Sequence, residues 1–474
     1  MISFGTGGWR AIIGEDFTKE NVQRLMLAVA RRMQAEGVAH KPFCIGYDRR
    51  FLSRQAAEWA AEVTAGEGIH TLFIHREAPT PLIMFSVQSW GLPYGAAITA
   101  SHNPALYNGI KLFTAGGRDA EESVTNEIAN AANRIQKSDI RAIPYAQALR
   151  LGLVEEFNPQ NQYLDAIIHA VDMEAIRNRN LQIILDPMYG VSRTSLQTIL
   201  LTARCEVSVI HERHDTLFGG RLPSPNVDTL GALQAAVLEN HADIGIATDG
   251  DADRLGIIDD HGRFIHPNEI LSLLYDYLLR HKKWHGPAVR NLATTHILDR
   301  IAQAFGQKCY EVPVGFKHIS AGMQRHNAII GGESSGGLTV RGHINGKDGI
   351  YAATLLVEML SVTGKKLSQL VQELYAKYGE TYMTEYDWPF DQEMKERLLQ
   401  KLMVDKSLPE FPAPIQSVTY LDGCKVCFAH GWLIARFSGT EPRLRVFCEM
   451  PSRPEAEAFS RVMADFLGLS LDLS

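Results

Sequence analysis

The chain contains few cysteines and no long hydrophobic run. Its 474 residues include six scattered cysteines, which do not form the dense pattern of a disulfide-stabilised secreted domain. Cys424 and Cys427 form a C-x-x-C in an alternating, strand-like run without a second ligand pair, so we expect packing there rather than a redox or zinc site. No apolar stretch approaches the roughly 18 residues that cross a bilayer, and no basic-then-apolar leader is found at the N-terminus. We therefore expect a cytoplasmic protein without a membrane partner.

An excess of positive charge is also missing. The formal net charge is −7 and the isoelectric point is about 6.2, which gives no reason to expect a nucleic-acid partner. With 45% hydrophobic and 21% charged residues, the composition is that of an ordinary globular protein. A local basic pocket for a small anion is compatible with these values.

Strand-like apolar runs alternate with amphipathic helical patterns along most of the chain. A helix is expected over residues 18–36, with Thr18 as its N-cap, followed by a strand at 43–47 and a helix at 53–65. The same alternation recurs, with strands expected at 69–75, 94–100, 181–186, 206–210, 243–247, 255–258, 293–295, 308–312 and 328–330 and helices at 192–202 and 298–305. Such alternation favours mostly parallel sheets covered by helices.

The length and this recurrence predict several domains. We expect an α/β protein with three similar mixed α/β domains and a smaller C-terminal α+β domain, at residues 1–150, 151–262, 263–373 and 374–474. The last unit follows a Pro- and charge-rich segment and is predicted from strands near 417–420, 425–428, 432–437 and 444–449 and a helix over 453–467.

A serine lies directly after a buried apolar strand in the first unit. Residues 99–104 read T-A-S-H-N-P, and Pro104 ends the strand and keeps Asn103 out of a helix, so Ser101 is predicted on a stiff turn. His102 adds a polar side chain beside the hydroxyl, and Lys111 follows shortly afterwards. Taken alone, this stretch reads as an ordinary turn.

Three carboxylates alternate in the loop D-G-D-A-D-R of the second unit. Asp249, Asp251 and Asp253 repel one another, so holding them together requires a cation, and oxygen ligands select a hard ion such as Mg²⁺. A calcium EF-hand does not fit, because its sixth position would be Arg254 instead of glycine. A solvated acidic turn is the structural alternative.

Two further loops carry groups suited to a sugar and to a phosphate. Residues 331–337 place Glu333 and Ser335 on a glycine-rich backbone, where a carboxylate can accept hydrogen bonds from two sugar hydroxyls. Residues 436–443 gather two arginines, two hydroxyls and a glycine amide, the donors that bind a phosphate dianion. A linker and a hairpin turn remain the alternatives for each loop alone. Residues 342–347 are not a Walker A loop, because only three residues separate the glycines.

In their order along the whole chain, these four loops resemble the motifs of the α-D-phosphohexomutase family, which includes phosphoglucomutase, phosphomannomutase and phosphoglucosamine mutase. The matching stretches are T-A-S-H-N-P-A-L-Y-N-G-I-K, D-G-D-A-D-R, G-E-S-S-G and R-F-S-G-T-E-P. The resemblance implies four domains around a central cleft and an isomerase that moves a phosphoryl group through a phosphoserine.

The resemblance also implies a role for individual residues. Ser101 would be the phosphoserine, and with Asp249, Asp251 and Asp253 it would hold one Mg²⁺. The residues around the transferring group would be Arg10, His102 and Lys111 (our candidate for proton transfer). Arg254 would be the arginine that closes the metal loop and a substrate-binding residue. The residues that bind the sugar and the non-transferred phosphate would be Lys317, Glu333, Ser335, Arg436, Ser438, Gly439 and Thr440.

The expected reaction interconverts a hexose 1-phosphate and a hexose 6-phosphate, with glucose 1,6-bisphosphate as intermediate and activator. The segment 314–319 and the absence of histidine at Gly337 resemble phosphoglucomutase-type members and favour glucose. Mannose, glucosamine and pentose phosphates stay open as substrates. A sugar-phosphatase or a non-catalytic sugar-phosphate sensor is the rival from another functional class. The expected partners are small sugar phosphates, and the expected state is a monomer or dimer.

Overall fold

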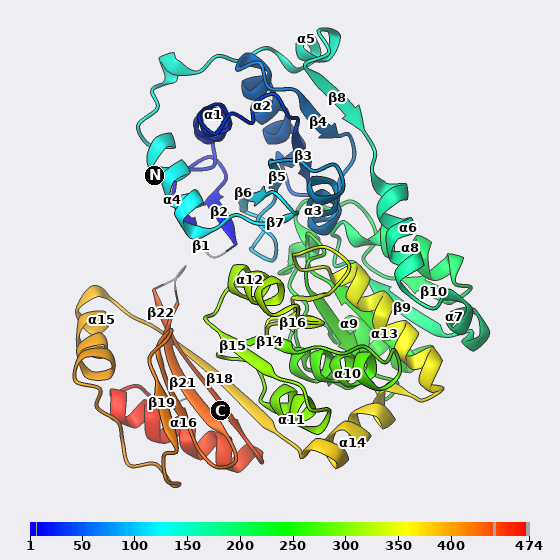
Figure 1. The fold of residues 1–474 in the computed structure, drawn as a ribbon, viewed down its shortest axis with the longest axis vertical. Coiled ribbons are helices and arrows are strands. Elements are labelled where there is room, and N and C mark those ends of the chain that lie inside the picture. Colours follow the sequence, from blue (N-terminus) through cyan, green and yellow to red (C-terminus); the bar gives the residue numbers. More distant parts are fainter. Residues whose placement is uncertain (6, 439–441, 471–474) are drawn as a thin grey trace.

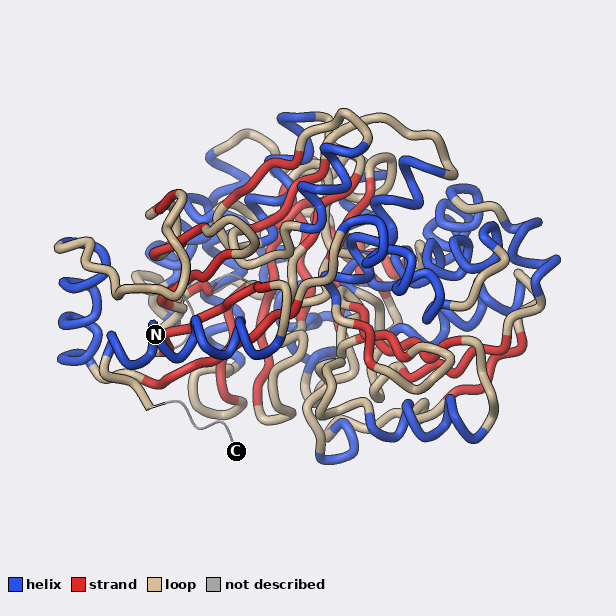
Figure 2. Tube along the Cα trace, turned by 90° about the horizontal axis from the view of Figure 1, so that it is seen from below, coloured by secondary structure: helices blue, strands red, loops and turns tan. Residues whose placement is uncertain are grey.

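The computed structural model describes residues 1–5, 7–438 and 442–470 and arranges them around four β-sheets (Figure 1). The first sheet, in blue and cyan, lies at the top of that view, and the fourth, in orange and red, lies at the lower left. Figure 2 shows the strands inside a surrounding layer of helices. Within the described residues, no helix is both long and apolar enough to cross a bilayer.

The first sheet is mixed and has the strand order β1–β2–β6–β5–β3–β4–β8, with β7 paired to β6. Its strands are β1 (Phe4–Gly5), β2 (Gly8–Ile12), β3 (Phe43–Tyr47), β4 (Thr71–Ile74), β5 (Tyr94–Ile98), β6 (Tyr107–Thr114), β7 (Arg118–Asp119) and β8 (Val154–Phe157). Its helices are α1 (Lys19–Ala35), α2 (Ser53–Gly66), α3 (Thr80–Ser89), α4 (Glu122–Ala132) and α5 (Tyr145–Arg150). The predicted cap is confirmed, because Thr18 accepts a hydrogen bond from the Asn21 amide.

The second and third sheets repeat a smaller version of this plan. The second sheet has the order β10–β9–β11–β12–β13, and the third has the order β15–β14–β16–β17. The strands are β9 (Gln182–Asp186), β10 (Glu206–Val209), β11 (Ile244–Thr248), β12 (Leu255–Ile258), β13 (Phe264–Ile265), β14 (Ala288–Asn291), β15 (Cys309–Val312), β16 (Ile330–Gly332) and β17 (Leu338–Val340). The helices are α6 (Gln160–Ala170), α7 (Met173–Arg179), α8 (Ser192–Thr202), α9 (Gly231–Glu239), α10 (Pro267–Arg280), α11 (Ile297–Ala304), α12 (Phe316–His326), α13 (Gly349–Thr363) and α14 (Leu367–Tyr378).

The fourth sheet is antiparallel throughout, in the order β18–β22–β21–β20–β19. Its elements are β18 (Tyr382–Pro389), α15 (Gln392–Leu399), β19 (Ser417–Thr419), β20 (Cys424–Cys427), β21 (Trp432–Phe437), β22 (Arg443–Met450) and α16 (Arg453–Leu467). The C-x-x-C lies in β20, and its two cysteines are free thiols in a packed strand. One hydrophobic cluster extends through the first three units, and the first unit has a second core on the other side of its sheet. The fourth unit has a core of its own, and a small cluster that includes Leu292 and Trp432 joins it to the third unit.

Several sequence predictions need correction. The strand expected at 293–295 is a turn, and the true strand is β14, whose polar residues Arg290 and Asn291 concealed it. Arg290 can be buried there because Asp299 and Glu311 pair with it. Strand β18 was missed because it is a charged edge strand. The first sheet extends past the boundary predicted at residue 150, since β8 pairs with β4, and α14 runs through the boundary predicted at 373.

Candidate active site

Ser101 lies in the loop that connects β5 to β6, and its backbone is strained. Its φ of 55° places a non-glycine residue in the left-handed region, which costs of order 1 kcal/mol or more and persists only where the surroundings enforce it. The enforcing group is the buried guanidinium of Arg50, which donates to the carbonyls of Ser101 and Asn103 at 2.6 Å each. The Thr99 hydroxyl accepts from the Ser101 amide at 2.8 Å. The turn is therefore held rigid before any substrate arrives.

The acidic loop between β11 and β12 faces this serine. The Ser101 hydroxyl donates to Asp249 Oδ2 at 3.0 Å and lies 3.3 Å from His102 Nδ1. Asp249, Asp251 and Asp253 are buried, and one oxygen from each lies within 4.8 Å of the others. The predicted serine and the predicted metal loop, distant in the chain, thus meet at one place.

The three carboxylates differ in their electrostatic state. Burial raises the pKa of Asp249 well above its usual value, and the neighbouring carboxylates add to the shift. Burial acts in the same direction on Asp253, but the Lys111 and Lys347 ammonium groups, 2.6 and 3.0 Å away, hold its pKa well below the usual value. Lys111 also donates to Asp251 at 2.6 Å. Although burial opposes it, these two carboxylates raise the pKa of Lys111, which therefore stays protonated at neutral pH.

The acidic loop fits a hard divalent cation. Among the described residues, no hydrogen-bond donor reaches the buried oxygens Asp251 Oδ1 and Asp253 Oδ1. A buried carboxylate oxygen without a partner is costly, and a cation would satisfy both oxygens at once. The donor set contains only oxygen, which suits Mg²⁺ rather than zinc.

Side chains from all four units line a common cavity of about 550 Å³. The predicted residues among them are Arg10, His102, Lys111, Arg254, Glu333, Ser335, Arg436 and Ser438. Burial first, and then the charges of Arg254 and Arg10, lower the pKa of His102 well below its usual value, so this imidazole is neutral at pH 7. Burial and Arg254 lower the pKa of Arg10 to about 10, which still leaves the guanidinium charged at neutral pH. Of these two side chains near the serine, only Arg10 therefore carries a charge at neutral pH.

Glu333 lies in the turn between β16 and β17, and donors from the same unit hold its carboxylate in place. Its Oε1 accepts from Asn291 Nδ2 at 3.2 Å and from the Gly315 amide at 3.1 Å. The Ser335 hydroxyl lies 3.4 Å from the other carboxylate oxygen. The two residues predicted to hold sugar hydroxyls therefore form one unit.

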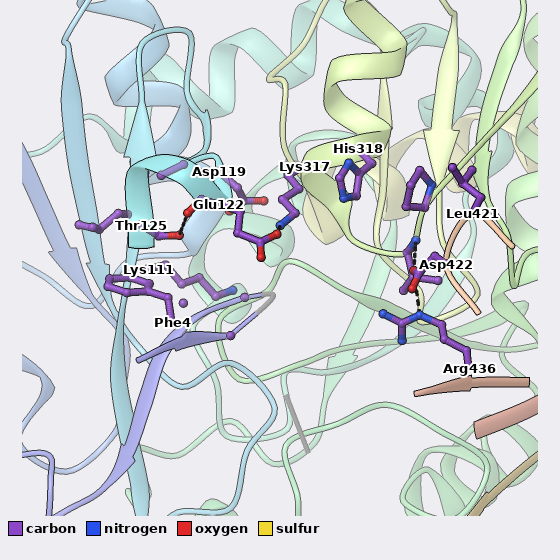
Figure 3. A pocket seen from close by; sticks show the side chains of 17 residues that line it. Phe4, Lys111, Asp119, Glu122, Thr125, Lys317, His318, Leu421, Asp422 and Arg436 are labelled. Carbon is purple, nitrogen blue, oxygen red and sulfur yellow. Dashed lines mark hydrogen bonds and ion pairs between the residues drawn. The ribbon is translucent and has the colours of Figure 1, made fainter. Parts of the chain in front are cut away.

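Lys317 does not line this cavity. It lies in an adjoining cavity of about 320 Å³, where its ammonium pairs with Glu122 at 2.5 Å (Figure 3). Lys111 and Arg436 line both cavities. Two other predicted phosphate-binding residues, Gly439 and Thr440, lie outside the described residues.

Three cavity residues escaped the sequence prediction. Lys347 was named only as part of a rejected Walker motif, yet its ammonium contacts Asp253. Asp119 lines both cavities, and burial raises the pKa of its carboxyl, but no sequence pattern marked it. Arg445 lies opposite Arg436 in the register of β21 and β22, and strand alternation from Arg443 could have identified it.

Comparisons with known proteins cover the same four units. Models of the phosphoglucomutase/phosphomannomutase family match in order: alpha/beta/alpha domain I at residues 1–139, domain II at 161–262, domain III at 266–378 and the C-terminal domain at 396–466.

Relatives match over nearly the whole chain. A phosphoglucomutase/phosphomannomutase of Thermococcus kodakarensis is 30% identical over 461 residues, covering 96% of each protein. A Pyrococcus abyssi protein described as a phosphoglucosamine mutase is 28% identical and covers 96% of this chain and 95% of its own. The crystal structure of a Thermus thermophilus protein described as a phosphomannomutase has a TM-score of 0.86 at 28% identity, covering 98% of this chain and 99% of its own.

Proposed function

The chain belongs to the phosphoglucomutase/phosphomannomutase family of mutases, and we propose that it interconverts glucose 1-phosphate and glucose 6-phosphate through a phosphoserine at Ser101. One observation carries the proposal: the hydroxyl of a strained, buried serine donates to Asp249 of the carboxylate triad at 3.0 Å, directly beside a cavity that His102 lines together with the sugar clamp and Arg436. A binding protein or sensor would need no such nucleophile.

The transfer balances as two exchanges. A sugar hydroxyl oxygen bonds to phosphorus while the Oγ–P bond of the phosphoserine breaks, which gives glucose 1,6-bisphosphate. After the bisphosphate turns around, Ser101 Oγ bonds to the phosphorus of its other phosphoryl group while the sugar O–P bond breaks, which leaves a free sugar hydroxyl. Lys111, which lines both cavities and is protonated, is our candidate for proton transfer: it would give a proton to the oxygen whose bond to phosphorus breaks and recover one from the attacking hydroxyl.

Positioning and positive charge are what phosphoryl transfer requires of a protein. Mg²⁺, held by the three aspartates and the phosphoserine, would stabilise the negative charge that spreads over the transferred group. Arg10 and Arg254 line the cavity next to Ser101 and add further positive charge. Arg436 would bind the phosphate that stays on the sugar, and Glu333 would accept hydrogen bonds from its hydroxyls.

The glucose preference is supported by the packing of Gly337. A Cβ at this position would collide with the Lys347 side chain, whose ammonium contacts Asp253. The histidine that we associate with phosphomannomutase and phosphoglucosamine mutase members therefore cannot occupy position 337 while Lys347 lies where it does.

A coupled assay tests the proposal. With Mg²⁺, glucose 1-phosphate and a trace of glucose 1,6-bisphosphate, we expect glucose 6-phosphate to form without release of inorganic phosphate. Release of phosphate without isomerisation would show a phosphatase. A higher kcat/KM for mannose, glucosamine or ribose phosphates would overturn the glucose assignment and leave the mutase chemistry standing.

A further inference from the structure

One carboxylate oxygen joins the arginine of the fourth unit to the third unit. Asp422 lies in the turn between β19 and β20, and its Oδ2 accepts from Arg436 Nε at 2.9 Å. The same oxygen accepts from the backbone amide of Val314, between β15 and α12, at 3.0 Å. Figure 3 shows Asp422 and Arg436 joined at the edge of the smaller cavity. Arg436 is only 9% exposed, so this contact fixes where its guanidinium can lie.

The next backbone amide continues the connection to the sugar clamp. Gly315, which follows Val314, donates its amide to Glu333 Oε1 at 3.1 Å. Its φ of 126° is open only to glycine among the common residues, and this conformation lets consecutive amides serve two different carboxylates. A continuous chain of contacts therefore runs from Arg436 through Asp422 and the 314–315 peptide to Glu333.

The chemistry of Asp422 suits this place. A guanidinium whose Nε–H is used by a carboxylate still has both terminal nitrogens for a phosphate. An ionised carboxylate oxygen has enough lone pairs to accept from Arg436 and Val314 together. An asparagine that turned its amide hydrogens toward these two donors would lose both contacts, and one that turned its neutral oxygen toward them would keep both without the charge that strengthens the contact with Arg436.

We propose that Asp422 is a positioning residue that sets the separation between the phosphate-binding arginine and the Glu333 sugar clamp, and thereby selects among hexose phosphates. The inference rests on the proposed function, because it takes Arg436 and Glu333 as the substrate-binding groups. It adds a determinant of specificity in a turn that lies apart from the serine and the metal loop.

The main test compares Asp422→Asn with Asp465→Asn, a matched change at an exposed aspartate on α16 of the same unit. For Asp422→Asn we expect KM for glucose 1-phosphate to rise about tenfold with kcat within about threefold, since a charge-assisted contact is lost away from the transferring group. The ratio of kcat/KM for glucose phosphate to kcat/KM for mannose phosphate should also fall. A general loosening of the fold would instead lower the two kcat/KM values by the same factor. Asp465→Asn should match the parent. A KM within twofold of the parent in folded Asp422→Asn would overturn the proposal.

A double-mutant cycle tests the connection to the clamp. If Asp422 acts through the 314–315 peptide, the combined Asp422→Asn and Glu333→Gln variant should lose less than the product of the single losses. If the losses of the two single variants multiply in the double variant, the coupling is contradicted. The control pair, Asp465→Asn with Glu333→Gln, should show such multiplying effects. If Asp422→Asn does not melt cooperatively, Asp422→Ser, which keeps a small acceptor, takes its place.

A binding measurement separates this inference from the proposed function. Calorimetry with glucose 1,6-bisphosphate or inorganic phosphate requires no turnover, and Asp422→Asn should weaken binding about tenfold. If the parent isomerises no hexose phosphate, the proposed function fails while this loss of affinity would still support the role of Asp422. If the parent is an active mutase and Asp422→Asn binds both ligands as the parent does, the inference fails alone.

Discussion

Two regions of the candidate active site are built in contrasting ways. In the reaction centre (Ser101, Lys111, Asp249, Asp251 and Asp253), every residue is at most 4% exposed, and the polar contacts lie within the first two units, apart from the Lys347 ion pair. In the recognition wall, defined as Glu333, Ser335, Arg436 and Ser438, only Arg436 is buried. Arg436 donates to Asp422 of its own unit, and Asp422 in turn accepts from the Val314 amide of the third unit.

The two tasks explain the difference. Phosphoryl transfer depends on charge that is fixed before the reaction, and a buried, strained loop provides it. Recognition by a mutase must accept the same sugar in two orientations, with the phosphate at either end. In our proposal the wall is assembled from two units, so contacts between these units, such as that of Asp422 with Val314, set its spacing, and the buried serine loop takes no part in them.

The largest expected effect lies in the reaction centre. Ser101→Ala removes the group that carries the phosphoryl in our proposal, so mutase activity should fall by on the order of 10⁴-fold or more. The coupled assay measures this loss, and the thermal midpoint should stay near that of the parent. Retained activity in Ser101→Ala would remove the basis of the contrast, because the buried loop would then not perform the chemistry.

A change within the acidic triad should be the next largest. Asp253→Asn should lower activity roughly 10³-fold through loss of the metal, and it leaves the buried Lys111 and Lys347 charges without this partner. When a chelator has removed the metal, we expect Asp253→Asn to lower the free energy of unfolding by about 3 kcal/mol.

Asp249→Asn is the matched control for that variant. Burial and the neighbouring carboxylates raise the pKa of Asp249 and so disfavour its charged form in the metal-free protein, and a neutral asparagine should therefore cost less there than at position 253. Activity should fall as far as in Asp253→Asn. The free energy of unfolding of the metal-free protein should change by less than about 1 kcal/mol, which the thermal midpoint measures. Equal destabilisation by both changes would show that the three carboxylates do not differ as described.

The reaction centre was predictable from the sequence to a greater extent than the wall. Ser101 and the triad lie in short contiguous motifs at strand ends, where residue type and spacing carry the chemistry. Asp422 contacts a unit that is distant in the sequence, and Asp119 reaches the cavities only through the folding of its strand, so no local pattern marks either residue. The same reason explains the errors in the fold: β14 and β18 contain charged residues whose partners lie on other strands or helices.

A smaller effect is expected in the recognition wall. Glu333→Gln keeps the size of the side chain but replaces an acceptor of two hydrogen bonds with an amide, so KM should rise about tenfold to a hundredfold while kcat changes less. Steady-state kinetics with glucose 1-phosphate measures the split. A fall in kcat with unchanged KM would instead place Glu333 in the transfer step and weaken the division between the two regions.

The smallest effect is expected at the junction between the third and fourth units, where His296 contacts Lys425. His296 at the start of α11 lies 3.1 Å from Lys425 of β20, and burial together with the Arg290 charge lowers the pKa of this imidazole. Below about pH 6.5 His296 binds a proton in the unfolded chain but stays neutral in the folded protein. The free energy of unfolding therefore falls as the pH drops, by at most about 1.4 kcal/mol per pH unit. Removing the imidazole in His296→Gln should reduce that slope.

Thermal midpoints at pH 7.5 and 5.5 measure this slope, with His430→Gln, at an exposed histidine between β20 and β21, as the control. The difference between the two midpoints should shrink in His296→Gln and stay unchanged in His430→Gln. Ser101→Ala should keep the parental slope, because the reaction centre does not depend on this junction. An unchanged slope in His296→Gln would mean that the folded junction accepts the proton, with Glu311 compensating the charge beside Lys425.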